Sequence, residues 1–262
     1  MPQYADQCGK PVTLSNFPSR IVSLVPSQTE LLYDLGLNEE VIGITKFCIH
    51  PAQWFSNKTR IGGTKSVNTE QVKALQPDLI IANKEENVKE QVDELTAHCP
   101  VWTSDISSLS QALQMIEAIG MITNTAAKAS DITAGINQQF ARLTAPAKNI
   151  RTAYLIWQDP FMTVGSDTFI HDMLTRCGFD NIFKTMQRYP VVTIEEISNC
   201  NCELLLLSSE PFPFKQKHVE KLRKQLPSTT ILLTDGEMFS WYGSRLLQSP
   251  AYFTSLFKMS DV

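Results

Sequence analysis

The feature that most constrains the fold of this chain is an internal repeat. Residues 70–82 (EQVKALQPDLIIA) parallel residues 195–207 (EEISNCNCELLLL) at a constant offset of 125. Glu85 and Glu210 match at the same offset, each just past an apolar run, and Gly36 and Gly178 each close a helical pattern. A duplication of this kind predicts two similar halves, each with its own core.

Short β-branched runs alternate with helical periodicity in both halves, which is typical of βαβ units. The spacing of Ser27 and Glu30 is that of a capping box at the start of a helix. Residues 125–143 carry apolar positions at helical spacing, which predicts a rod of roughly 28 Å. We therefore predict an α/β fold of two Rossmann-like lobes with mostly parallel sheets. The lobes span residues 1–123 and 149–262, and one long backbone helix within 124–148 joins them.

Composition excludes several classes of protein. The 262 residues are 43% hydrophobic, carry a net charge of −4 and show no Lys/Arg cluster of the sort that tracks phosphates, which argues against a nucleic-acid partner. No apolar run reaches the roughly 20 residues that span a bilayer. The first residues lack the pattern of a secretory signal, so either an export signal is missing from this sequence or the protein stays in the cytoplasm. The six cysteines lack metal-site spacing and are expected to be free thiols.

Ligands of open α/β sheets bind beyond the carboxyl ends of the strands, so the loops after the predicted strands are the candidate site. Several of these loops carry aromatic residues, which favours a flat apolar ligand, although each ring has an even chance of packing under its own loop. His50 is either an axial ligand to a chelated iron or cobalt or a hydrogen-bonding surface residue. The candidate ligand-binding residues are Pro26, Ser27, Thr29, Phe47, His50, Asn83, Trp157, Phe161, Gly165, Met238, Phe239, Trp241 and Arg245.

No recognisable catalytic motif occurs, so binding without chemistry is predicted. An intracellular enzyme or assembly factor on the same two-lobed fold is the alternative. A receptor for free metal ions is disfavoured because the four histidines lie on separate segments. Glu85, Glu86 and Glu210 fall at matching ends of the two halves, where they either dock a partner or are simply solvated.

Three stretches resemble the helical-backbone (class III) substrate-binding proteins of cobalamin, haem and ferric-siderophore ABC importers. Residues 20–36 (RIVSLVPSQTELLYDLG) are similar to the opening strand and helix of that family. Residues 68–82 are similar to its most familiar stretch, and residues 165–182 to the counterpart in the second lobe. The resemblance covers roughly residues 12–257 and is closest to the cobalamin-binding members.

This resemblance implies a rigid linking helix and a ligand held by aromatic residues between the lobes. It implies a corrinoid such as cobalamin as the ligand, with haem or a ferric siderophore next, and no intrinsic cofactor. The implied partners are an ABC permease and its ATPase, docked through Glu85 and Glu210, and the implied state is a monomer in the periplasm or on the cell surface. Phe47 and His50 fall where the cobalamin binder has tyrosines, and Trp157 falls on a phenylalanine. Asn83 and Met238 stand where it has tryptophans.

Overall fold

The structure is a computed structural model that describes residues 3–144, 146 and 148–259. The chain forms two compact units. Unit 1 comprises residues 1–106, 110–136 and 242–245, and unit 2 comprises residues 107–109, 137–241 and 246–262. The predicted lobe boundaries remain predictions, but residues 242–245 pack with the first half of the chain. Among the described residues, no helix is long and apolar enough to cross a membrane.

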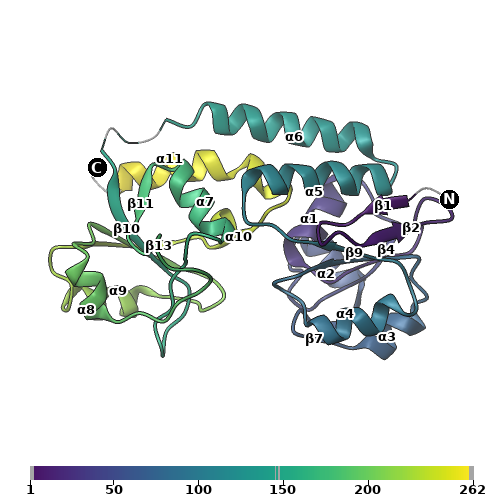
Figure 1. Cartoon of the computed structure of the whole chain (residues 1–262), viewed down its shortest axis with the longest axis horizontal. Helices are drawn as coiled ribbons and strands as arrows, with labels where there is room; N and C mark the ends of the chain where they lie inside the picture. Colours follow the sequence, from purple (N-terminus) through teal and green to yellow (C-terminus); the bar gives the residue numbers. More distant parts are fainter. Residues whose placement is uncertain (1–2, 145, 147, 260–262) are drawn as a thin grey trace. The chain divides into compact units, whose positions relative to one another are not determined.

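Unit 1 is built on a parallel five-stranded sheet in the order β5-β4-β3-β8-β9. In Figure 1, α5 lies on one side of this sheet and α3 and α4 lie on the other. Two short hairpins, β1–β2 and β6–β7, lie outside the sheet. The elements are β1 (Gln3–Ala5), β2 (Pro11–Thr13), β3 (Ile21–Ser23), α1 (Pro26–Asp34), β4 (Val41–Ile44), α2 (Ala52–Asn57), β5 (Thr59–Arg60), β6 (Gly62–Gly63), β7 (Ser66–Val67), α3 (Thr69–Ala74), β8 (Leu79–Asn83), α4 (Lys89–Thr96), β9 (Val101–Ser104) and α5 (Leu109–Ile122).

Unit 2 is built on a parallel four-stranded sheet in the order β11-β10-β12-β13. Helices α8 and α9 cover one face, and α7 and α11 lie on the other side (Figure 1). The elements are β10 (Ile150–Leu155), α7 (Phe169–Arg176), β11 (Phe179–Asn181), α8 (Ile194–Asn199), β12 (Leu204–Ser208), α9 (Gln216–Arg223), β13 (Thr230–Thr234), α10 (Glu237–Ser240), a 3-10 helix (Ser244–Leu247) whose first two residues pack in unit 1, and α11 (Ser249–Met259).

The two sheets repeat one topology. Strand order β4-β3-β8-β9 in unit 1 corresponds to β11-β10-β12-β13 in unit 2. The helix before the third strand and the strand itself, α3 with β8 and α8 with β12, keep the offset of 125 residues at both of their ends. The prediction of a duplicated α/β fold with parallel sheets is therefore confirmed.

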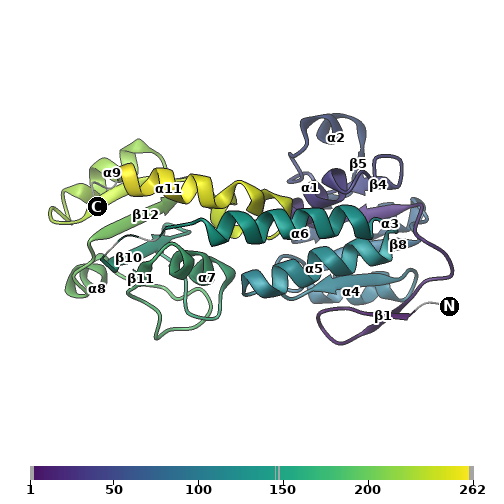
Figure 2. The same cartoon turned by 90° about the horizontal axis from the view of Figure 1, so that it is seen from above.

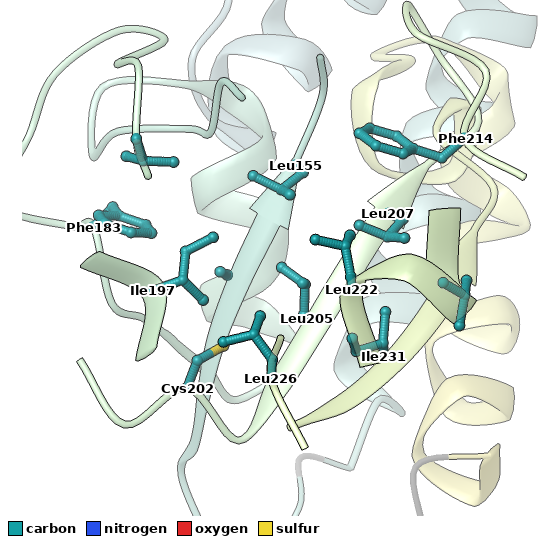
Figure 3. Close-up of a cluster of buried hydrophobic side chains, with 13 residues drawn as sticks. Leu155, Phe183, Ile197, Cys202, Leu205, Leu207, Phe214, Leu222, Leu226 and Ile231 are labelled. Carbon is teal, nitrogen blue, oxygen red and sulfur yellow. The ribbon is translucent and has the colours of Figure 1, made fainter. Parts of the chain in front are cut away.

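Strand β12 explains why its sequence is a continuous run of leucines. All five of its residues are buried, because helices cover both faces of a parallel sheet. Leu205 and Leu207 point into a cluster beneath α8 and α9, where Ile197 and Leu222 meet them (Figure 3). Leu204 and Leu206 alternate to the opposite face.

Helix α6 (Ala126–Ala141) has 16 residues, fewer than the 19 of the predicted rod. It runs beside α5 in both views (Figure 2), and the two helices approach closely at Gly120, where an added Cβ would lie 2.3 Å from the Cβ of Ala129. The boundary between the two units falls after Ile136, within this helix.

The start of α1 corrects one prediction. Val25 is the N-cap residue and makes no side-chain cap, and Pro26 occupies the first turn, where a missing N–H costs nothing. Ser27 and Glu30 therefore do not form a capping box. The helix ends as predicted, because Gly36 adopts a φ of +88° that residues with a Cβ rarely tolerate. All six cysteines are free in this structure.

Candidate functional site

The carboxyl edge of the unit 1 sheet is built on a buried polar network around Asn83. The Asn83 side chain is 2% exposed, and its amide nitrogen donates to Ser104 Oγ at 3.0 Å. Its Oδ1 accepts from the backbone N–H groups of Glu85 and Glu86, at 2.9 Å each. Asn87 Oδ1 in turn accepts from the Asn83 backbone N–H at 2.8 Å. Asn83 therefore shapes the loop that carries the two glutamates.

The loop after β4 presents its side chains alternately outward and inward. Phe47 is 52% exposed and Ile49 is 46% exposed, whereas Cys48 between them is fully buried. The Thr29 hydroxyl donates to Cys48 Sγ at 3.1 Å. Burial raises the pKa of Cys48 to about 11, so this thiol stays protonated at neutral pH. The half-buried His50 completes the loop, which offers two apolar side chains to solvent.

The loop after β10 presents an apolar face in unit 2. Isolated antiparallel bridges join Trp157 to Met162 and Met162 to Val191. Side chains of directly paired residues lie on the same face, so these three lie side by side. Trp157 is 40% exposed and Val191 is 56% exposed. The Trp157 ring also packs edge-on against Phe212, with ring centroids 5.8 Å apart.

The carboxyl ends of β12 and β13 flank a cavity of about 470 Å³ in unit 2. Two of the loops that the sequence indicated as candidates therefore meet here. The cavity is lined by Leu207, Ser209, Phe214, Leu233, Thr234, Asp235 and Glu237.

Glu210 holds α10 against the loop after β12. Its Oε1 accepts from Ser240 Oγ at 2.6 Å and from Trp241 Nε1 at 3.0 Å. Burial raises the pKa of the Glu210 carboxyl, although these two hydrogen bonds oppose that shift. The neighbouring Phe239 is fully buried, with its ring centroid 5.2 Å from that of Tyr154.

Residues 242–245 form a short segment that is fixed to unit 1 by ionic and hydrogen bonds, and we call it the return segment. Arg245 makes a bidentate ion pair with Glu30, with Nε and Nη2 at 2.9 and 2.6 Å from the two carboxylate oxygens. Tyr242 donates its hydroxyl to Glu86 Oε1 at 2.7 Å, and Ser244 donates to Asp34. Burial raises the pKa of Glu30, and the adjacent Arg245 opposes this. Glu30 therefore serves the return segment and not a helix cap.

Comparison with known protein families identifies the family to which this two-unit α/β fold belongs. The sequence profile of a family described as periplasmic binding protein matches residues 21–227, which is more than half of the chain. The chain belongs to this family. Its members are binding proteins rather than enzymes, so the alternative of an enzyme is set aside.

Named relatives resemble this binding protein over most of their length. A vitamin B12-binding protein of Vibrio parahaemolyticus is 25% identical, with 75% of this chain and 74% of the relative covered. An uncharacterised ABC transporter substrate-binding lipoprotein of Bacillus subtilis is 29% identical, with 82% and 71% covered. Among solved structures, a periplasmic haem-binding protein of Roseiflexus has a TM-score of 0.80 at 20% identity, with 93% and 99% covered. The vitamin B12-binding protein of Vibrio cholerae has a TM-score of 0.74 at 20% identity, with 94% and 98% covered. These structural matches confirm the helical-backbone class of fold.

The predicted site residues of this binding protein differ in how far their side chains are exposed to solvent. Their roles in ligand binding and docking stay predictions. Two aromatic residues, Phe47 and Trp157, are exposed. The half-buried residues are Pro26, His50, Glu85, Glu86, Phe161, Glu210 and Met238. The buried residues are Ser27, Thr29, Asn83, Gly165, Phe239, Trp241 and Arg245.

Sequence reasoning missed Val191. It lies 34 positions after Trp157 and reaches it only through the two bridges at Met162, for which no local pattern gives a signal. Among the residues that the structure describes, no three His, Cys, Asp or Glu side chains come together as a metal site. A metal held by a chelating ligand needs no such cluster, so His50 stays a candidate for axial ligation alone.

Proposed function

We propose that this protein is the substrate-binding component of an ABC importer and that its ligand is a bulky metal chelate. Cobalamin or another corrinoid is the first choice, and haem or a ferric siderophore comes next. The names of the relatives support this choice of ligands. The proposal places the protein in the periplasm or on the cell surface, as a monomer that works with a permease and its ATPase.

The observation that carries the ligand proposal is the exposure of Phe47 and Trp157. Phe47 follows β4 of the unit 1 sheet and Trp157 follows β10 of the unit 2 sheet, and ligands of open α/β sheets bind beyond the carboxyl ends of such strands. An aromatic side chain can bury roughly 150–250 Å², so two exposed rings at strand ends can contribute a large apolar contact to a bound ligand. A corrin or porphyrin offers a matching flat apolar surface.

The single variants Phe47→Ala and Trp157→Ala should each weaken chelate binding about tenfold, because each removes one ring from the ligand contact. Calorimetric titration with cyanocobalamin, haemin and a ferric catecholate measures the three affinities. Phe17→Ala is the matched control, since Phe17 is 54% exposed but precedes β3 and so lies away from the carboxyl edge. Absence of binding by all three chelates at micromolar protein would refute the ligand class.

Glu85 and Glu210 are the proposed contacts with the permease. Each lies two residues past the end of its strand, β8 or β12, at equivalent places in the repeat. Glu86 is the third candidate, but its carboxylate accepts from Tyr242 within unit 1.

The double variant Glu85→Gln/Glu210→Gln should lower ligand uptake by cells about tenfold while leaving ligand affinity unchanged, because neutral side chains lose the attraction to cationic groups on the permease. Glutamine retains an acceptor for the Ser240 and Trp241 hydrogen bonds. Glu39→Gln/Glu195→Gln is the control, since both of these side chains are exposed and lie away from the strand ends concerned. A parallel fall in ligand affinity would instead assign Glu85 and Glu210 to the ligand site.

A further inference from the structure

Helix α9 carries a row of lysines that faces away from the core of unit 2. Its inner side buries Val219 and Leu222 in the cluster beneath the sheet. Lys217, Lys221 and Lys224 follow one another at intervals of four and three residues, and all three are exposed. Lys224 is the C-cap residue and keeps helical angles, so the 3.6-residue period places the three on one line opposite the buried side. We call this line the α9 lysine ridge.

The ridge gathers several exposed lysines on one helix. Some exposed lysines elsewhere pair with carboxylates, as Lys10 and Lys89 do with Asp93, and others such as Lys46 and Lys128 stand singly. Within the described part of the chain, no ion pair involves the three ridge lysines. Lys215 and Arg223 are exposed beside the ridge, and Glu220 is the one acidic residue within α9. The basic residues of the last turn suit the helix dipole, and Glu220 stands four residues before Lys224, so the helix itself tolerates the ridge, which leaves three ammonium groups directed at solvent.

The repeat shows that the scaffold does not require a basic helix at this place. Helix α4 lies between β8 and β9 as α9 lies between β12 and β13. Its sequence, KEQVDELT, has one lysine and three acidic residues, a net charge of −2, whereas QKHVEKLR of α9 has a net charge of +2. The two equivalent helices therefore carry opposite charge on the same fold.

We propose that the α9 lysine ridge binds the headgroup surface of anionic phospholipids. Lysines are depleted at protein–protein interfaces, where aromatic residues and arginine prevail, so a lysine row does not favour a protein partner. A lysine ammonium on a flexible stem suits laterally mobile phosphate groups, and clusters of basic residues on an amphipathic helix are typical of anionic-lipid binding. The net charge of −4 gives the protein no general attraction to such a surface, so contact would be confined to the ridge.

The test is flotation of the full chain with vesicles of phosphatidylcholine alone or of phosphatidylcholine and phosphatidylglycerol in equal parts. The protein is expected to float with the anionic vesicles at low salt and to be released as salt screens the charges. Lys217→Gln/Lys221→Gln/Lys224→Gln should lower the partition coefficient about a hundredfold, because each lysine near an anionic surface contributes a factor of about five.

The control variant Lys10→Gln/Lys84→Gln/Lys89→Gln changes the net charge by the same amount at exposed ion pairs and should float like the unchanged protein. Circular dichroism checks that both variants are folded. The inference is overturned if the two variants float equally or if phosphatidylcholine alone retains the protein. Tighter association with a single-stranded oligonucleotide than with the anionic vesicles would overturn it in favour of nucleic acid.

Discussion

Replacing Arg245 by alanine should lower the free energy of unfolding by about 3 kcal/mol, because the variant leaves Glu30 as a largely buried and unpaired charge. The side chains of Arg245 and Glu30 are only 9% and 14% exposed, and both guanidinium bonds would be lost together. Urea denaturation monitored by circular dichroism measures the change.

The control is Arg176→Ala. Arg176 pairs with Asp172 one helical turn away, with exposures of 37% and 23%, and pairs of this kind stabilise a protein by about 0.5 kcal/mol or less. The double variant Glu30→Leu/Arg245→Met should recover most of the loss, because it removes both charges and retains packing. Equal losses for Arg245→Ala and Arg176→Ala would show that the buried pair does not anchor the return segment.

The loss in free energy of unfolding caused by Arg245→Ala should also depend on pH. Burial already raises the pKa of Glu30, and the charge of Arg245 opposes that rise, so the variant should raise this pKa further. A carboxyl with a raised folded pKa destabilises the protein fully above that pKa and progressively less as pH falls through it. The loss in free energy of unfolding is therefore expected to be largest at neutral pH and to shrink as pH falls toward the ordinary carboxyl pKa of 4.5.

Leu205→Ala should lower the free energy of unfolding by about 3 kcal/mol, since it opens a cavity in a fully buried part of β12. Figure 3 shows Leu205 among Leu222, Leu226 and Ile231, side chains that cannot close over the space without moving the strands and helix that carry them. The shift in the urea midpoint at unchanged slope measures the loss.

Leu233→Ala is the matched control for this core substitution. Leu233 lies on the adjacent strand β13, opposite Leu207, and is 38% exposed at the edge of the unit 2 cavity. Its truncation should lower the free energy of unfolding by less than about 1 kcal/mol, because little apolar surface leaves the core. Similar losses for both leucines would mean that β12 is not the central strand of a packed core.

Local sequence patterns predicted the helices and strands, because such patterns depend only on residues that are neighbours in the chain. The leucine run of β12 and the glycine after α1 each mark an element without reference to the rest of the chain. The contacts at the candidate site are different. The Glu30–Arg245 pair joins residues 215 positions apart, and no spacing in the sequence indicates it. Glu30 has the spacing of a capping residue, so the local rule gave the wrong partner.

The sequence also could not predict which loop aromatic side chains are exposed to solvent. Phe47 and Phe239 both appear as aromatic residues in loops, yet one is 52% exposed and the other fully buried. The difference arises from the rings of Tyr154 and Phe253, which enclose Phe239 from distant parts of the chain. Likewise, the lysines of α9 do not form an unbroken run, so the sequence predicted no phosphate-binding cluster, and only the helical period brings them into the row for which we propose that role.

The return segment has a consequence for how the chain matures during synthesis. A ribosome releases the strands and helices of unit 1 first, but Arg245 and Tyr242 emerge only after most of unit 2. Until then, Glu30 lacks Arg245 and Glu86 lacks Tyr242, so these two contacts of unit 1 form late in synthesis. Unit 1 can therefore form its Glu30–Arg245 ion pair only after most of the chain has been synthesised.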